Sequence, residues 1–171
     1  MITTVVAGNP KPASRTLDAA TVVLERLTGR APDNVVDVIG LGPGLLGWGD
    51  EAVAAAVRTV AASDLVVVAS PTFKATYTGV LKLFLDQFAT GDGLAGVVAV
   101  PLMLGAGPAH ALAPEVFLKP VLVELGATVP APALYLNDKH YSEPASTEAW
   151  VARWRDVLLG AVTSLPEGTR S

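Results

Sequence analysis

Hydroxyl and basic side chains gather in residues 8–16, between an apolar run and a segment with helical spacing. Ser14, Arg15 and Thr16 stand where a helix would begin, and Lys11 lies just before them. The first turn of a helix presents free backbone N–H groups and the positive end of the helix dipole. The segment therefore has the composition of a phosphate-binding loop, although it lacks the Gly-Lys-Ser/Thr of a Walker A loop. The alternative is a capped helix with solvated basic residues.

Two further loops follow apolar runs. Residues 70–79 are rich in small, hydroxyl and aromatic side chains, and their backbone N–H groups could bind the edge of a flat heteroaromatic ring bordered by Phe73 and Tyr77. In the loop after the next apolar run, Gly105 and Gly107 permit the backbone to approach a ligand closely. A structural turn explains each loop equally well, so the residues alone leave both interpretations open.

No motif for another kind of chemistry has the surrounding elements or the spacing that it requires. Residues 42–47 match G-x-G-x-x-G, but they follow the second apolar run and no helix begins there, so they are not a dinucleotide fingerprint. His110 and His140 are too far apart to indicate a metal pair, and no G-x-S-x-G nucleophile motif occurs. We therefore predict no catalytic side chain and no metal site.

The composition excludes several classes of protein. With no Cys among 171 residues, disulfides, thiolate metal sites and Cys nucleophiles are ruled out. A formal net charge of −4 provides no basic surface for a nucleic acid. Residues 93–114 carry no charged side chain, but Pro101, Gly105 and Pro108 would break a helix that crossed a membrane. No signal peptide is recognisable, so we expect a cytoplasmic protein that binds neither nucleic acid nor membrane.

Apolar runs and helical patterns alternate five times along the chain. The predicted strands cover residues 2–7, 35–39, 65–69, 97–104 and 129–136, and the predicted helices cover 14–27, 50–62, 78–88, 109–125 and 147–164. Strands that are apolar on both faces and alternate with helices form a parallel sheet covered on both sides, a three-layer α/β sandwich. We expect one domain over residues 1–171. Ligands of such sheets bind beyond the carboxyl ends of the strands, where the three loops lie.

Together the three loops resemble those of the NADPH-dependent FMN reductase family, which has a flavodoxin-like fold. The most specific part is residues 71–82, which resemble the family's run of a proline, an aromatic residue and Gly-x-Leu/Met-Lys, continued at 84–86. Residues 8–16 are similar to its phosphate loop, G-S-P-x-x-x-S-R-T. Residues 108–110 and 117–121 resemble the alkanesulfonate-type reductases within the family. The resemblance implies a five-stranded sheet in the order 2-1-3-4-5.

The resemblance also implies which residues bind FMN. They are Ser14, Arg15 and Thr16, with Asn9 in the place of a usual Ser, at the phosphate; Pro71, Thr72, Phe73 and Lys74 along the isoalloxazine; and Gly105, Ala106 and Gly107 over its pyrimidine side. Three positions lack a hydroxyl that the family usually has near the ring, namely Phe73, Leu104 and Ala106. Each loss removes a hydrogen bond worth about 0.5–1.5 kcal/mol. We therefore expect FMN to be an exchangeable substrate and not a tightly held group.

By this resemblance, the chain would reduce FMN with NADPH or NADH and supply the reduced flavin to a partner flavin-dependent monooxygenase. It would assemble as a homodimer or homotetramer. One alternative is a quinone or azo reductase that uses bound FMN in the same loops. A non-catalytic electron-transfer protein of the flavodoxin type and a module that has lost its flavin are further alternatives. The flavodoxin type fits less well, because such proteins resemble T-x-T-G-x-T in the first loop and are usually more acidic.

Overall fold

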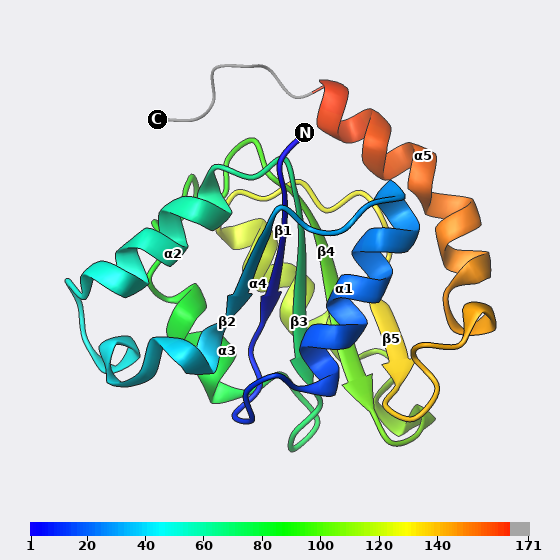
Figure 1. The fold of residues 1–171 in the computed structure, drawn as a ribbon, viewed down its shortest axis with the longest axis horizontal. Coiled ribbons are helices and arrows are strands. Elements are labelled where there is room, and N and C mark those ends of the chain that lie inside the picture. Colours follow the sequence, from blue (N-terminus) through cyan, green and yellow to red (C-terminus); the bar gives the residue numbers. More distant parts are fainter. Residues whose placement is uncertain (165–171) are drawn as a thin grey trace.

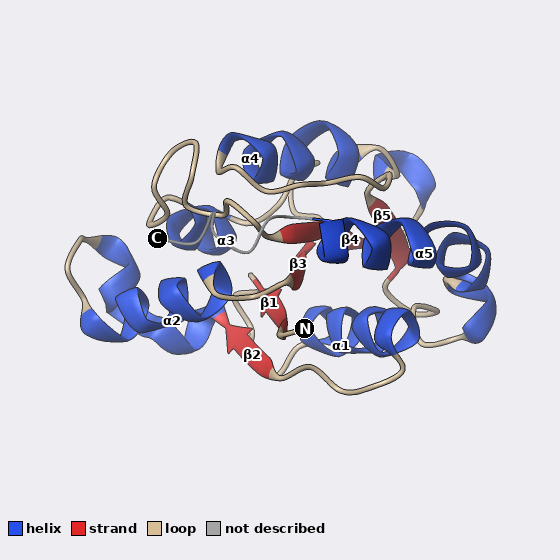
Figure 2. Cartoon of the chain, turned by 90° about the horizontal axis from the view of Figure 1, so that it is seen from above, coloured by secondary structure: helices blue, strands red, loops and turns tan. Residues whose placement is uncertain are grey.

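The computed structural model describes residues 1–164, and at its centre lies a parallel sheet of five strands. The strands are β1 (Thr3–Ala7), β2 (Asn34–Asp37), β3 (Leu65–Pro71), β4 (Val98–Gly105) and β5 (Leu134–Asn137). They lie in the order β2-β1-β3-β4-β5. Figure 1 shows the strands side by side, and Figure 2 shows helices above and below them. The predicted flavodoxin-like α/β sandwich, with its strand order, is confirmed.

Two hydrophobic cores, one on each face of the sheet, hold the layers together. The helices are α1 (Arg15–Thr28), α2 (Glu51–Ala61), α3 (Gly79–Leu85), α4 (Lys119–Glu124) and α5 (Glu148–Ser164). α1 and α5 pack on one face, and α2, α3 and α4 on the other. Side chains alternate along a strand, so β3 contributes to both cores. Its Val66 and Val68 pack under α2, α3 and α4, whereas Leu65 and Val67 pack under α1 and α5. None of these described helices combines the length and apolar character of a membrane span.

Polar caps fix the start of the two helices that follow the predicted ligand-binding loops. The side chain of Ser14 accepts a hydrogen bond from the backbone N–H of Leu17 at the start of α1. The side chain of Thr78 does the same for Leu81 at the start of α3. Such caps satisfy N–H groups that have no partner inside the helix. Both loops are therefore anchored at the end that faces the helix.

The predicted helix over residues 109–125 is broken into three pieces. A 3₁₀ turn covers Pro108–His110, a π-helical turn covers Pro114–Leu118, and only then does α4 begin. In the π turn the N–H of Lys119 bonds to the carbonyl of Pro114, five residues back. Pro120 follows at once, and because proline has no N–H group it cannot donate to the carbonyl of Val116, which interrupts the regular helical bonding.

The last strand is shorter than predicted. It begins at Leu134 and not at residue 129, because Pro130 and Pro132 cannot donate hydrogen bonds to a neighbouring strand. Before them, Thr128 forms a single isolated bridge to β4. β5 is therefore a four-residue strand at the edge of the sheet, and the loop that leaves it turns at once beside the end of β4.

The glycine-rich segment after β2 is also more ordered than a simple loop. Residues 38–46 form 3₁₀ turns that are interrupted at Gly42, where φ is 59° and ψ is −144°. The G-x-G-x-x-G sequence thus lies in 3₁₀ turns and does not open a helix, which supports its exclusion as a dinucleotide site. Trp48, which follows, is 77% exposed.

Candidate functional site

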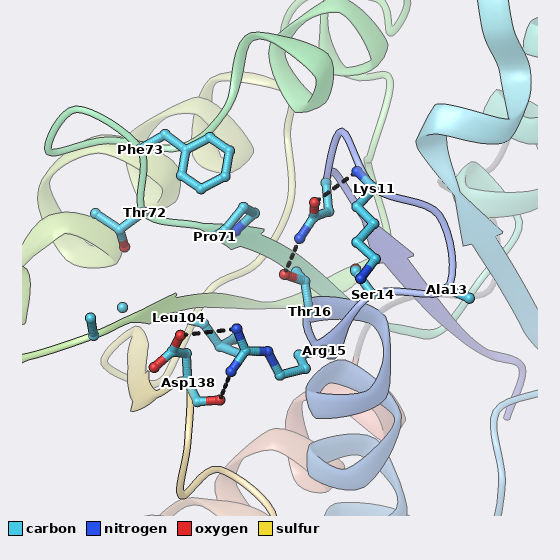
Figure 3. A pocket seen from close by; sticks show the side chains of 13 residues that line it. Lys11, Ala13, Ser14, Arg15, Thr16, Pro71, Thr72, Phe73, Leu104 and Asp138 are labelled. Atoms are coloured by element: carbon cyan, nitrogen blue, oxygen red, sulfur yellow. Dashed lines mark hydrogen bonds and ion pairs between the residues drawn. The ribbon is translucent and has the colours of Figure 1, made fainter.

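A pocket opens at the carboxyl ends of β1, β3 and β4, where the order of strands in such a fold predicts a ligand site. Its volume is about 470 Å³, within the range of small-molecule sites. The residues that line it are Asn9, Lys11, Ala13, Ser14, Arg15, Thr16, Pro71, Thr72, Phe73, Leu104, Gly105, Ala106 and Asp138 (Figure 3). We call residues 9–16 its helix end, and residues 71–73 with 104–106 its strand end.

The helix end presents hydrogen-bond donors without partners. The backbone N–H groups of Arg15 and Thr16 are the first two of α1, and neither donates to another residue in the described chain. The hydroxyl of Ser14 accepts a bond from the N–H of Leu17, and that of Thr16 accepts one from Asn9 Nδ2 at 2.9 Å. A hydroxyl that accepts still has its own proton to donate. Four donors are thus available to an anion at the N-terminus of α1.

Side chains hold the loop in this shape. The Asn9 carboxamide bridges it, because Nδ2 donates to Thr16 Oγ1 and Oδ1 accepts from the N–H of Lys11 at 2.9 Å. Ala13 has a φ of 47°, unusual for a residue other than glycine, and its N–H donates to Asp37 Oδ2 at 2.8 Å. Asp37 ends β2, so a neighbouring strand stabilises the strained residue. The donors of the helix end are therefore preorganised by bonds inside the protein.

The two cationic side chains of the helix end, Lys11 and Arg15, differ in their ion pairing. Arg15 Nη2 lies 3.3 Å from Asp138 Oδ2, and Arg15 Nη1 donates to the Asp138 carbonyl at 3.0 Å. Within residues 1–164, Lys11 takes part in no ion pair. Figure 3 shows the Arg15 side chain turned towards Asp138, while that of Lys11 extends over Ser14 at the start of α1. Lys11 is thus the cation available to an anion at this end.

The strand end is apolar and partly open. Pro71 lines it from the end of β3 and Phe73 from the loop that follows, and Phe73 is 52% exposed. The N–H of Thr72 bonds to the carbonyl of Leu104 at 2.7 Å, which joins the two strands at the floor of the pocket. The Thr72 Oγ1 atom is buried and interacts with the Tyr135 hydroxyl, so the Thr72 side chain is held beside the end of β4.

The loop after Phe73 is a tight turn that folds back on itself. The N–H of Phe73 donates to the Thr76 carbonyl at 2.9 Å, and the reverse bond is 3.2 Å. Between them, Lys74 and Ala75 have φ values of 52° and 71°, which side chains other than glycine rarely adopt. Lys74 is exposed and does not line the pocket, so its predicted place along a ring stays a prediction.

Three residues of β5 and its loop hold the carbonyl groups at the end of β4. The N–H of Asp138 donates to the Gly105 carbonyl at 3.0 Å, Asn137 Nδ2 to that of Ala106 at 3.1 Å, and Tyr135 Oη to that of Gly107 at 2.6 Å. In a trans peptide, a carbonyl and the following N–H point in opposite directions. The Ala106 N–H therefore points away from β5 and towards β3, and it has no partner among the described residues.

Gly105 is required by this arrangement. A Cβ atom at this position would lie 1.9 Å from the Tyr135 hydroxyl oxygen. Burial and the negative charge of Asp138 raise the pKa of Tyr135, and a hydrogen bond with the Thr72 side chain partly offsets this rise, so the hydroxyl remains a donor. Gly107 lines an adjoining hollow of about 590 Å³, which shares Thr72, Gly105 and Ala106 with the pocket.

The structure brings together most of the residues that the sequence predicts. All the predicted binding residues line the pocket except Lys74 and Gly107. Asp138 was not predicted, because it follows the weakest strand and belongs to no motif. The donors at the helix end and the open amides and apolar wall at the strand end fit a ligand with a phosphate and a flat heteroaromatic ring. No group of three or more metal-ligating side chains occurs within the part of the chain that is described.

Known proteins share this fold and sequence pattern. Residues 1–142 match the family described as NADPH-dependent FMN reductase. An FMN reductase (NADPH) of Pseudomonas putida is 32% identical over 91 residues, 53% of this chain and 46% of that protein. An FMN reductase (NADPH) of Escherichia coli K12 is 45% identical over 65 residues, 38% of this chain and 34% of that protein. The chain thus matches less than half the length of these curated relatives.

Solved structures extend the likeness to nearly the whole chain. The apo form of an NADH:FMN oxidoreductase superposes with a TM-score of 0.80 and 30% identity, covering 98% of this chain and 92% of the other. An oxidoreductase from Corynebacterium diphtheriae shares the fold, with a TM-score of 0.77, 24% identity and 96% of both chains covered. On the family match over residues 1–142 and the likeness to the NADH:FMN oxidoreductase, the chain belongs to the NADPH-dependent FMN reductase family.

Proposed function

We propose that this chain binds FMN in the pocket and reduces it with NADPH or NADH. The observation that carries the proposal is that one pocket joins an anion-binding helix end to an apolar strand end (Figure 3). FMN has the matching parts, a phosphate at one end and an isoalloxazine ring at the other. The names of the curated relatives, both FMN reductases (NADPH), support the same activity.

At the helix end, the chain would bind the phosphate without a metal. The N–H groups of Arg15 and Thr16 and the hydroxyls of Ser14 and Thr16 are the donors, and Lys11 adds positive charge. Asn9 would act through Thr16, because its carboxamide bonds to that hydroxyl and is not itself free. Hydrogen bonds to a charged group are worth about 1.5–3 kcal/mol each, so this end would supply much of the affinity.

At the strand end, the chain would orient the ring and stabilise its charge. Pro71 and Phe73 would contact the ring, with the Thr72 side chain beside them. The N–H groups of Ala106 and Gly107 would donate to the pyrimidine side, where negative charge develops on reduction. The bound flavin supplies the redox chemistry by accepting a hydride from the nicotinamide. No acid or base from the chain is needed, in line with the lack of a catalytic motif.

We also propose that FMN is an exchangeable substrate. The ring-side hydroxyls that would strengthen binding are missing at Leu104, Ala106 and Phe73, and the Phe73 side chain is half exposed. Two or three missing hydrogen bonds raise a dissociation constant by roughly tenfold to several hundredfold. The purified protein should therefore be nearly colourless, and NAD(P)H oxidation should saturate as free FMN is added. A yellow protein that keeps stoichiometric FMN through dialysis, with a rate indifferent to added FMN, would contradict exchange.

The placement of the phosphate can be tested by comparing two flavins. Riboflavin lacks the phosphate, so a substitution at the helix end should separate its affinity from that of FMN. We expect Arg15→Ala to raise the dissociation constant for FMN by about tenfold and that for riboflavin by less than about twofold. Fluorescence titration of each flavin measures both constants. An equal loss for the two flavins would contradict this placement.

The resemblance to alkanesulfonate-type reductases carries a further proposal, that the reduced flavin leaves for a partner flavin-dependent monooxygenase. The open strand end is consistent with release. In a coupled assay, the chain and a flavin-dependent monooxygenase held apart by a dialysis membrane should still give product if reduced FMN diffuses between them. Product only when the two proteins share a compartment would contradict free diffusion.

We propose that the chain forms a homodimer or homotetramer, with α3 and the segment before and within α4 contributing to the interface. Leu112, Val116, Phe117 and Val123 are large apolar residues exposed on this segment. Exposed apolar side chains grouped in this way are typical of association surfaces. Leu118, in contrast, is fully buried in the core and would not take part. Light scattering at micromolar concentration should show a multiple of 17.6 kDa, and a monomer would contradict the proposal.

A further inference from the structure

Asp138 occupies the point where the two ends of the pocket meet. Its backbone N–H holds the Gly105 carbonyl at 3.0 Å, and its own carbonyl accepts from Arg15 at 3.0 Å. Its carboxylate lies against the same guanidinium, with Oδ2 at 3.3 Å, and the side chain is only 25% exposed. The other carboxylate oxygen, Oδ1, is buried and has no hydrogen-bond partner. The structural bonds of Asp138 thus come from its backbone, whereas its carboxylate is paired with Arg15 and lies near the neutral Tyr135 hydroxyl.

A carboxylate is an unexpected neighbour for an anion site. It neutralises Arg15 in the free protein, so the guanidinium is already paired when a phosphate arrives. Its buried Oδ1 lowers stability, since a buried acceptor without a partner loses its hydration and gains nothing. Neither packing nor the fold of the loop requires the charge, because an asparagine would keep both backbone bonds. Ligand binding, and not the fold of the loop, therefore accounts for the carboxylate.

We propose that Asp138 is a specificity-determining residue that lowers the affinity of the pocket for the flavin phosphate, by competing with that phosphate for Arg15. The inference rests on the proposed function, since it takes FMN as the ligand. A phosphate at the N-terminus of α1 would have to share Arg15 with Asp138 or displace it. Lys11 and the donors of the helix end would then hold the phosphate with less help from Arg15. Asp138 thus keeps FMN exchangeable from the phosphate side, as the missing hydroxyls do from the ring side.

The test is Asp138→Asn, which removes the charge and keeps both backbone bonds. Fluorescence titration should show the dissociation constant for FMN falling by about three- to tenfold, as expected for a partly exposed charge near a dianion. The constant for riboflavin should change by less than about twofold. The gain for FMN should shrink at high ionic strength, because screening weakens charge interactions near the surface. Circular dichroism and a thermal melt verify that the variant is folded.

Two matched variants separate competition for Arg15 from a general change of charge. Asp37→Asn removes a carboxylate that also borders the loop but bonds to the N–H of Ala13 and not to Arg15. It should give no gain in FMN affinity, and a gain equal to that of Asp138→Asn would overturn the proposal. In an Arg15→Ala background, Asp138→Asn should also give little gain, because the cation that it releases is absent. An undiminished gain there would overturn the competition for Arg15.

The remaining outcomes distinguish this inference from the function on which it rests. If the wild type binds FMN but Asp138→Asn leaves its affinity unchanged or lowers it, the role of Asp138 is wrong and the proposed function stands. Weaker binding of both flavins would show that the carboxylate accepts a hydrogen bond from the part that they share, which also overturns the competition. If the wild type binds neither flavin, the proposed function fails, and this inference fails with it.

Discussion

The two ends of the pocket are built in different ways. At the helix end, Ser14 and Thr16 are buried, the Asn9 side chain bonds to two points of the loop, and the one residue with a strained φ, Ala13, is bonded to Asp37. At the strand end, Phe73 is half exposed and introduces a turn in which two successive residues have positive φ. Two backbone bonds inside the turn itself hold it closed. The first end is preorganised, whereas the second is open and strained.

The contrast follows from what each end is proposed to bind. A phosphate is a small, strongly hydrated anion, and only donors already in place can replace its water without a large loss of entropy. A flat ring binds by contact over a wide area and needs few directed bonds. In a flavin reductase, the ring must also leave one face open to the nicotinamide. The strained turn beside Phe73 would then be tolerated because it shapes an edge that binds no anion.

The largest expected effect comes beneath the pocket, where the first loop packs against the start of α3. Gly8 follows β1, its carbonyl accepts from the Thr78 hydroxyl at 2.6 Å, and a Cβ here would lie 2.2 Å from Leu81 Cβ. Gly8→Ala should therefore lower the free energy of unfolding by about 3 kcal/mol or more, because it forces β1 and α3 apart. Urea unfolding measures the change. Gly79→Ala is the control, since nothing lies within 4 Å of its added Cβ, and a similar loss there would contradict the argument.

The second prediction distinguishes the two ends of the pocket by which flavin each substitution weakens. Asn9→Ala removes two hydrogen bonds from the helix end and leaves Thr16 without its orienting partner. The free energy of unfolding should fall by about 1–2 kcal/mol, and FMN affinity should fall by about five- to tenfold, with little change for riboflavin. Phe73→Ala, at the strand end, should weaken both flavins alike, by about three- to tenfold. If Asn9→Ala weakened riboflavin as much as FMN, the division of the pocket into two ends would be wrong.

A third, smaller effect tests the strain in the turn. Glycine adopts the φ of 71° found at Ala75 without the penalty of about 1–2 kcal/mol that a side chain incurs. Part of that gain is offset by the greater entropy of glycine in the unfolded chain. Ala75→Gly should thus raise the free energy of unfolding by about 0.5–1 kcal/mol, measured by urea or thermal unfolding. A lower stability would show that the turn is held by contacts of the Ala75 methyl group and is not strained.

The smallest effect concerns the loop after β5 that carries Asp138. Tyr141 donates to Asp18 Oδ2 at 2.7 Å, and burial together with that carboxylate raises its pKa to about 12. An unfolded tyrosine titrates near 10. Because the folded pKa is the higher one, the contribution is complete below about pH 10 and is lost as the pH rises towards 12. Wild type should lose stability over this range more steeply than Tyr141→Phe, by less than about 1 kcal/mol, in urea unfolding at several pH values. Identical slopes would contradict the prediction.

Local patterns in the sequence were sufficient for most of the fold. Runs that are apolar at every position, such as Leu65–Ala69, predicted strands buried on both faces, and the caps at Ser14 and Thr78 marked where helices begin. The prolines of the last third were harder to interpret. Their missing N–H groups shorten β5 and interrupt the helical hydrogen bonds near Pro120, where a π turn gives way to α4.

The sequence by itself determined the three loops and the chemistry that each could offer, because hydroxyl, basic and glycine residues lie next to one another along the chain. Only the tertiary structure decided which charges are available to a ligand. Arg15 and Asp138 are 123 positions apart, and no local pattern relates them. They meet because the parallel sheet brings the carboxyl ends of β1, β4 and β5 to one edge, where α1 begins. Charge interactions depend on distance in space, so the net charge that Lys11, Arg15 and Asp138 present to a ligand is set only when the sheet is assembled.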